Sequence, residues 1–120
     1  MSEYKVYFYR KSNNKKVPVK EYLEKLSKGE QAKIASYIQL LRENEGYLEE
    51  PYSRHLKDGI RELRPKNDRV LYVLVKGKKI ILLHAFRKTT QKTPSGEIEK
   101  AEEYFQDYKT HPKFTLESYK

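Results

Sequence analysis

Two apolar segments joined by a very short connection constrain the fold of this chain more than any other feature. Val70–Val75 and Ile80–Phe86 are almost unbroken runs of Val, Ile, Leu and aromatic residues, which is typical of strands covered on both faces. Their connection, Lys76–Lys78, contains a glycine and predicts an antiparallel hairpin. A further strand beginning at Ile60 is followed by turn-forming residues, Pro65–Asp68. The sequence therefore predicts a three-strand antiparallel meander.

The chain before the meander predicts one strand and two helices. Tyr4–Arg10 alternates apolar and polar residues, which indicates a strand. Apolar residues with helical spacing predict a first helix that begins at Pro18 and ends at Gly29, and a second helix from about Glu30 to Asn44. The two helices form a short hairpin. Tyr47–Gly59 has no periodicity and contains Pro, Gly and alternating charges, so it is predicted to be a loop.

The chain after the meander predicts a last helix. Thr93 and Pro94 make a suitable N-cap and first-turn pair, and helical spacing continues to Tyr108. Residues 109–120 have no clear period and are expected to form a loosely attached tail. This element order predicts an α+β fold in which the C-terminal helix packs on the sheet, with residues 1–120 as a single domain.

Composition limits the partners and cofactors of the chain. Lys and Arg number 26 against 17 Asp and Glu, so the net charge is +9, which favours nucleic acid, an anionic membrane or an acidic protein as partner. The absence of Cys excludes disulfides and thiolate metal sites. Three scattered His and no acidic pair predict no metal, and no other cofactor is expected. The N-terminus lacks a signal peptide and no segment reaches membrane-spanning length, so a cytoplasmic protein without membrane contact is expected.

Basic residues and histidines gather at the ends of the meander strands and in the loop before them. A hydrophobic core does not need this density of positive charge, so an anionic ligand is predicted to bind here. Lys92 adds to it beside the start of the last helix, where free backbone N–H groups favour phosphate. The residues are Arg54, His55, Arg61, Arg64, Lys66, Arg69, His84, Arg87, Lys88 and Lys92.

Three segments together carry a resemblance to a known family. The sequences ELRPKNDRVLYV, LLHAF and FRKTTQKTP resemble the phage-derived, HigB-like branch of the RelE/ParE toxin superfamily, and Phe86–Pro94 is the most specific part. The resemblance implies a RelE-like fold and the toxin of a type II toxin-antitoxin system. Such a toxin is a ribosome-dependent mRNA endonuclease (mRNA interferase) that cuts translated mRNA. A helix-turn-helix, HigA-like antitoxin would neutralise it, in a complex expected to be heterotetrameric.

Two other functions are compatible with the same features. The ParE branch of the superfamily implies a DNA gyrase inhibitor without nuclease activity, and fold alone does not separate the two. A basic nucleic-acid-binding module without catalysis is the other alternative, for which a charge of +9 suffices. The grouping of Arg64, Arg69, His84 and Lys88 favours the nuclease, because a protein-binding surface would not need these residues together.

Metal-free RNA cleavage through the 2′-hydroxyl needs a base, cations that stabilise the phosphorane, and an acid for the leaving oxygen. Arg69 opens a strand and is assigned to the scissile phosphate, because a guanidinium grips phosphate with two hydrogen bonds. Its alternative role is an ion pair with Glu62 on the neighbouring strand. The other basic residues are expected to bind the RNA backbone, namely Arg54, His55, Arg61, Arg64, Arg87 and Lys92.

Four residues are candidates for the proton-transfer groups. His84 is predicted to share a strand face with Leu82, Phe86 and Lys88 and to act as acid or base. Its alternative role is a hydrogen-bonded core histidine. Lys88 is chosen over its neighbour Arg87, which would point to the other face. The resemblance implies a lysine or a loop glutamate as base, which leaves Lys57 and Glu50 both open.

Overall fold

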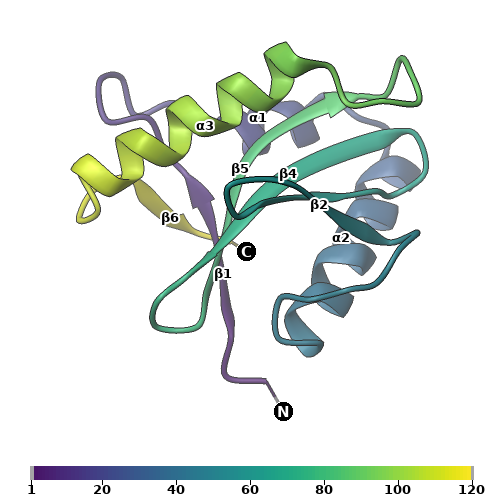
Figure 1. Ribbon diagram of the computed structural model, residues 1–120, viewed down its shortest axis with the longest axis horizontal. Coiled ribbons are helices and arrows are strands. Elements are labelled where there is room, and N and C mark those ends of the chain that lie inside the picture. Colours follow the sequence, from purple (N-terminus) through teal and green to yellow (C-terminus); the bar gives the residue numbers. More distant parts are fainter. Residues whose placement is uncertain (1, 120) are drawn as a thin grey trace.

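One six-stranded sheet forms the centre of the molecule in the computed structural model, which describes residues 2–119 (Figure 1). The strands are β1 (Lys5–Tyr9), β2 (Ser53–Lys57), β3 (Ile60–Leu63), β4 (Asp68–Val75), β5 (Lys79–Arg87) and β6 (Leu116–Ser118). Their order across the sheet is β2-β3-β4-β5-β1-β6. β1 pairs with β5 in parallel, and every other neighbouring pair is antiparallel. The predicted meander is therefore confirmed as β3-β4-β5.

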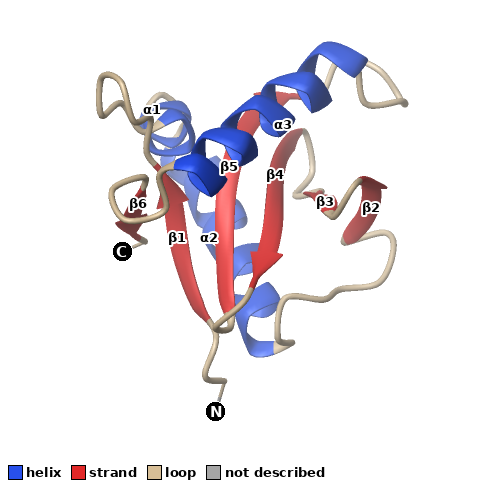
Figure 2. Ribbon diagram, turned by 60° about the vertical axis from the view of Figure 1, so that its left-hand side comes forward, coloured by secondary structure: helices blue, strands red, loops and turns tan. Residues whose placement is uncertain are grey.

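Three helices cover the two faces of this sheet (Figure 2). They are α1 (Pro18–Glu24), α2 (Lys28–Glu43) and α3 (Ser95–Thr110). α3 lies on one face, and α1 and α2 lie on the other. Ser27 begins α2 with a capping box to Glu30, so α1 and α2 are separate helices, as predicted. The predicted boundary at Gly29 is wrong, because α1 ends at Glu24 and Gly29 lies in the first turn of α2. No helix among the described residues is long and apolar enough to cross a membrane.

Each face of the sheet has its own apolar core. On the α1/α2 face, Ile34 and Ile38 of α2 pack against inward side chains of the strands. On the α3 face, Ala101 and Tyr104 do the same. Residues such as Val70 and Leu71 are neighbours in sequence but belong to different cores, because successive strand side chains point to opposite faces. Together with the helix positions, this confirms the predicted α+β class.

A β-bulge in β5 separates Leu82 from the strand face that His84 shares with Phe86. Leu71 of β4 pairs with His84, but the next residue, Tyr72, pairs with Leu82, so Leu83 is an extra residue in β5. As a result Leu83 and His84 both point to the α3 face, whereas Leu82 points to the α1/α2 core. The expected alternation along β5 is broken at the bulge.

The predicted loop from Tyr47 to Gly59 is wrong in its second half. Ser53–Lys57 forms β2, which pairs with β3 at the edge of the sheet. Asp58 and Gly59 both have positive φ, at 51° and 84°, as in the two-residue turns that favour Asp-Gly in hairpins. The sequence did not reveal this strand, because an edge strand carries polar side chains and β2 has no apolar run.

The prediction of a loosely attached tail is also wrong. Within residues 109–120, β6 pairs antiparallel with β1. Thr115, just before β6, is fully buried. Tyr119 packs beside Phe8 with a ring centroid separation of 5.3 Å. This segment therefore closes one edge of the sheet.

Candidate functional site

A buried glutamate in β3 lies at the centre of the basic residues. The side chain of Glu62 is only 2% exposed, and the Thr93 hydroxyl donates a hydrogen bond to its Oε2. The Nε atoms of Arg54 and Arg64 lie 3.7 and 3.6 Å from its Oε1. Both Nε atoms are buried, and within residues 2–119 neither has a hydrogen-bond partner. The Glu62 carboxylate thus compensates the charges of two guanidinium groups by electrostatic attraction, because the distances from its Oε1 to their Nε atoms are too long for hydrogen bonds.

Arg69 lies beside this glutamate at the start of β4. It is 6% exposed, and its Nη1 donates to the carbonyl oxygens of Lys66 and Asp68, at 2.9 and 2.8 Å. Backbone carbonyls therefore orient the guanidinium, and no ion pair to Glu62 shorter than 4.0 Å forms in the described part of the chain. Burial lowers the pKa of Arg69, and repulsion from Arg64 adds to this effect, while Glu62 opposes it.

The loop of residues 88–94 brings two lysines to the same place. Lys88 and Lys92 line a small hollow together with Glu62, Arg69 and Phe86. The volume of this hollow is about 10 Å³, which is about one water molecule, so a phosphate would bind at its mouth. The backbone N–H of Lys88 donates to the carbonyl oxygen of Asn67 at 2.8 Å. We name these side chains the Arg69 cluster: Arg54, Arg64, Arg69, Lys88 and Lys92 around Glu62.

The beginning of α3 differs from the prediction at Thr93 and Pro94. Pro94 is the N-cap residue, and no side chain caps the helix. The Thr93 hydroxyl bonds to Glu62 instead, because the buried carboxylate needs a donor. The N-terminus of α3 follows directly on the loop that carries the two lysines.

His84 does not join the Arg69 cluster. Its Nε2 lies 2.6 Å from Oε1 of Glu97 in α3, and its ring packs between Phe86 and Tyr104, at centroid distances of 5.6 and 6.1 Å. Burial lowers the pKa of His84, although Glu97 opposes this effect. The structure confirms the alternative role, a hydrogen-bonded histidine of the core. Phe86 stacks on His84 and also lines the hollow beside Arg69, so it lies between them.

Arg87 and Arg61 lie on the opposite, α1/α2 side of the sheet and do not reach the cluster. Arg87 Nη1 is 2.7 Å from Oε2 of Glu30 in α2, which confirms that Arg87 and Lys88 diverge. Arg61 Nε donates to the Tyr72 hydroxyl at 3.3 Å, and Tyr72 belongs to the core under α2. Both arginines therefore have structural partners and lie apart from Arg69, with which they were predicted to group.

The other predicted residues are dispersed around the β2 edge. His55 is exposed and pairs across the strands with Arg61, so it faces away from the cluster. Lys57 Nζ forms an ion pair with Oε2 of Glu102 in α3, at 3.2 Å. Glu50 is exposed in the turn before β2. Of the five residues predicted to be catalytic, only Arg69 and Lys88 come together.

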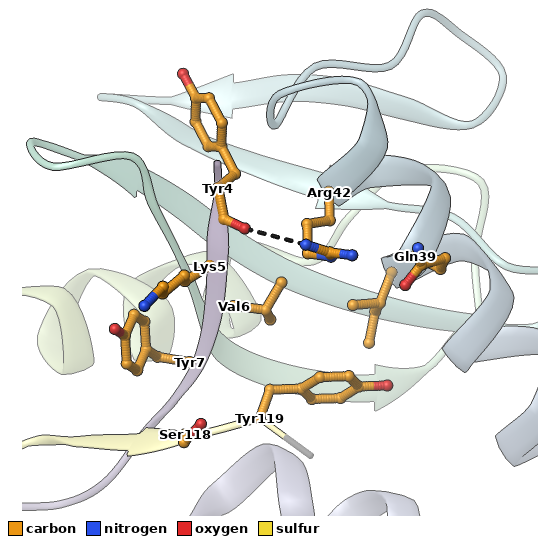
Figure 3. Close-up of a pocket in the computed structure, with 9 residues that line it drawn as sticks. Tyr4, Lys5, Val6, Tyr7, Gln39, Arg42, Ser118 and Tyr119 are labelled. Carbon is orange, nitrogen blue, oxygen red and sulfur yellow. Dashed lines mark hydrogen bonds between the residues drawn. The ribbon is translucent and has the colours of Figure 1, made fainter. Parts of the chain in front are cut away.

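A separate groove lies between β1, β6 and α2 (Figure 3). Its volume is about 590 Å³. Arg42 Nη1 reaches the Tyr4 carbonyl oxygen across it, at 3.5 Å, and Tyr119 forms another part of its wall. None of the residues predicted from sequence to be catalytic or to bind an anion lines this groove, so volume alone does not identify the functional site.

Sequence reasoning missed the central position of Glu62 and Thr93. The sequence feature that could have revealed it is the glutamate in Glu62-Leu63-Arg64. Glu62 and Arg64 share one face of the strand, whereas Leu63 enters the core on the α1/α2 face. A carboxylate at a buried position of a strand needs cations and donors nearby.

Comparison with known proteins places the chain in a family. No curated protein matches it. The family model of the phage-derived protein Gp49-like family matches residues 21–106, which is more than half of the chain. The matched segment contains every residue of the Arg69 cluster, together with Glu62 and Thr93. The chain therefore belongs to the phage-derived Gp49-like family, which is a RelE-like toxin family.

Proposed function

We propose that this protein is the toxin of a type II toxin-antitoxin system and acts as a ribosome-dependent mRNA endonuclease. The observation that supports this most is the Arg69 cluster. Arg54 and Arg64 lie within 4.0 Å of the Glu62 carboxylate, and the other three cations line the hollow beside it. Such an excess of positive charge at the surface of a folded domain suits a polyanion. The family membership supports the toxin part of the proposal.

The proposed reaction is an attack of the ribose 2′-oxygen on the adjacent phosphorus. The bond from phosphorus to the 5′-oxygen breaks, which leaves a 2′,3′-cyclic phosphate and a 5′-hydroxyl. Arg69 binds the scissile phosphate, and Arg54 and Arg64 stabilise the extra negative charge of the phosphorane. Lys88, as an ammonium group, supplies a proton to the leaving 5′-oxygen, because it alone among the predicted acid-base groups lines the hollow with Arg69. A water molecule takes the proton of the 2′-hydroxyl.

The partners in this proposal are the ribosome with its bound mRNA and an antitoxin. The ribosome would present the message in a fixed conformation at the cluster, which lowers the cost of orienting the reacting groups. The HigA-like antitoxin would carry an acidic segment that covers the same cations, in a heterotetrameric complex.

The test is cell-free translation of a reporter mRNA followed by primer extension, with wild type, Arg69→Ala and Lys88→Ala. The wild type should produce cuts in codon register only on translated message. Each variant should lower the cleavage rate by about 100-fold or more, since transition-state contacts of this kind are worth about 10² to 10³ in rate. Lys76→Ala, in the exposed turn between β4 and β5, is the matched control and should cleave like wild type.

Either of two results would contradict the proposal. One is unchanged cleavage by both site variants, which would remove the Arg69 cluster from the reaction. The other is intact message together with inhibition of DNA supercoiling by gyrase, which would make the protein an inhibitor of the ParE type.

A further inference from the structure

We propose that Glu62 and Thr93 form a positioning pair, which sets the spacing of the arginines and holds the lysine loop against β3. This inference rests on the proposed function, because the groups it positions are those assigned to the RNA phosphate. Neither residue would touch the reacting atoms. The pair acts through the Arg69 cluster.

The burial of Glu62 is the first reason. Its carboxylate is almost entirely removed from water, and a buried charge is costly unless cations and hydrogen-bond donors compensate it. An apolar residue would serve the core equally well at this position. The carboxylate instead links three segments, because Arg54 comes from β2, Arg64 follows β3, and Thr93 precedes α3.

The repulsion between the guanidinium groups is the second reason. Arg54 and Arg64 both disfavour the charged form of Arg69, and Glu62 favours it. Without a negative charge between them, the Arg54 and Arg64 side chains would move away from Arg69, whose guanidinium is held by the Lys66 and Asp68 carbonyl oxygens. Glu62 therefore keeps them close enough to bind one phosphate.

The attachment of the loop is the third reason. Residues 88–94 are tied near one end by the Lys88 N–H bond to the Asn67 carbonyl oxygen. At the other end they are tied by the Thr93 hydroxyl bond to Glu62. Thr93 is buried, whereas Lys92 is exposed. Loss of the Thr93 hydroxyl would release one end of the segment that carries both lysines.

The charge of Glu62 gives the inference a distinctive consequence. As an anion, Glu62 opposes the binding of RNA phosphate, so Glu62→Gln should bind RNA at least as tightly as wild type. The amide still accepts the Thr93 hydrogen bond but no longer neutralises the arginines. We expect the cleavage rate to fall about 10- to 100-fold, as for misplacement of reacting groups by about 1 Å. A purely structural role would weaken binding and cleavage together.

The experiment measures single-turnover cleavage of ribosome-bound mRNA, with affinity measured separately by fluorescence anisotropy. The affinity probe is a fluorescein-labelled, all-2′-deoxy oligonucleotide with the sequence of the cut site. Thr93→Val should slow cleavage by about 10-fold or more, and Thr93→Ser, which keeps the hydroxyl, should restore it to within about 3-fold of wild type. Thr115→Val is the control, because it also removes a buried threonine hydroxyl bond, to the His111 carbonyl oxygen at 2.7 Å, outside the cluster.

The outcomes separate this inference from the proposed function. A wild type that does not cleave overturns the proposed function and the inference with it. If the wild type cleaves and Thr93→Val cleaves at the same rate, the proposed function stands and the positioning pair is refuted. It is also refuted if Glu62→Gln loses affinity and rate in equal proportion, or if Thr115→Val slows cleavage as much as Thr93→Val.

Discussion

A carboxylate at the far end of α3 should make the stability of this protein depend on pH in the acid range. Asp107 accepts a hydrogen bond from the Tyr9 hydroxyl at 2.6 Å, and from the Ser12 hydroxyl and backbone N–H at 2.7 and 3.0 Å. His111 Nδ1 lies 3.2 Å away. Burial by itself would raise the pKa of Asp107, but these donors outweigh it and lower the pKa from 3.8 to about 2. These bonds join the end of β1 to α3.

The pKa difference gives the size and sign of the effect. One pKa unit corresponds to about 1.4 kcal/mol, so the native environment of Asp107 contributes about 2 kcal/mol to the free energy of unfolding once its partial exposure is allowed for. A carboxyl whose pKa is lower in the folded state binds fewer protons there than in the unfolded state. Its contribution is therefore complete above pH 4 and is lost as the pH falls from about 4 to about 2.

Urea denaturation of wild type and Asp107→Asn at pH 7, 5 and 3 measures this contribution. The variant should be less stable by about 2 kcal/mol at pH 7 and 5, and the difference should shrink clearly at pH 3. Asp58→Asn, in the exposed turn between β2 and β3, is the control and should stay within about 0.5 kcal/mol of wild type. A difference between Asp107→Asn and wild type that is the same at all three pH values would refute the reasoning.

Two further predictions concern backbone conformation and the buried histidine. Gly46 has a φ of +86°, and a Cβ there would lie 2.5 Å from Leu74 Cδ2, so Gly46→Ala should lower the free energy of unfolding by about 1 to 3 kcal/mol. Gly96→Ala, in α3 with open space around it, should instead raise it by about 0.5 to 1 kcal/mol, and equal losses in both variants would contradict this account. For His84, an NMR titration should give a pKa below 6.5, and the Glu97→Gln substitution should lower it further, because Glu97 favours the charged form; a rise would contradict the assignment. Since the folded state keeps His84 neutral, its contribution to stability is present above pH 6.5 and decreases as the pH falls below that value.

Local sequence signals predicted the helices and the meander well. Pro18 begins α1 and Gly46 follows α2 with positive φ, as their residue types indicate. The two strands around Lys76–Lys78 follow from their composition. The elements that the sequence did not reveal depend on distant partners. β6 pairs with β1, which comes from the other end of the chain. The three residues of β6 have mixed polarity and are too few to show the alternation of a strand.

The candidate site was predicted only where strand alternation is regular. Arg69 and Lys88 come together as expected. Alternation correctly puts His84, Phe86 and Lys88 on one face, and the bulge removes only Leu82 from it, with an extra residue that leaves no mark in composition. His84 stays outside the cluster because Phe86 lies between it and Arg69, and because Glu97 of α3 binds its ring. The positions of Arg54 and His55 could not be predicted without recognising β2 as a strand. Because neighbouring side chains of a strand alternate, Arg54 faces Glu62 and His55 faces away from it.

The measurement that tests the central claim most directly compares two ribosome-bound mRNAs that differ in one atom. The first has ribose throughout, and the second has a single 2′-deoxynucleotide immediately before the cut. The account predicts that wild type cuts only the first, leaves a 2′,3′-cyclic phosphate and a 5′-hydroxyl, and that Arg69→Ala cuts neither. Cleavage of the deoxy message at the same position, or products with a 5′-phosphate, would contradict attack by the 2′-hydroxyl at the Arg69 cluster.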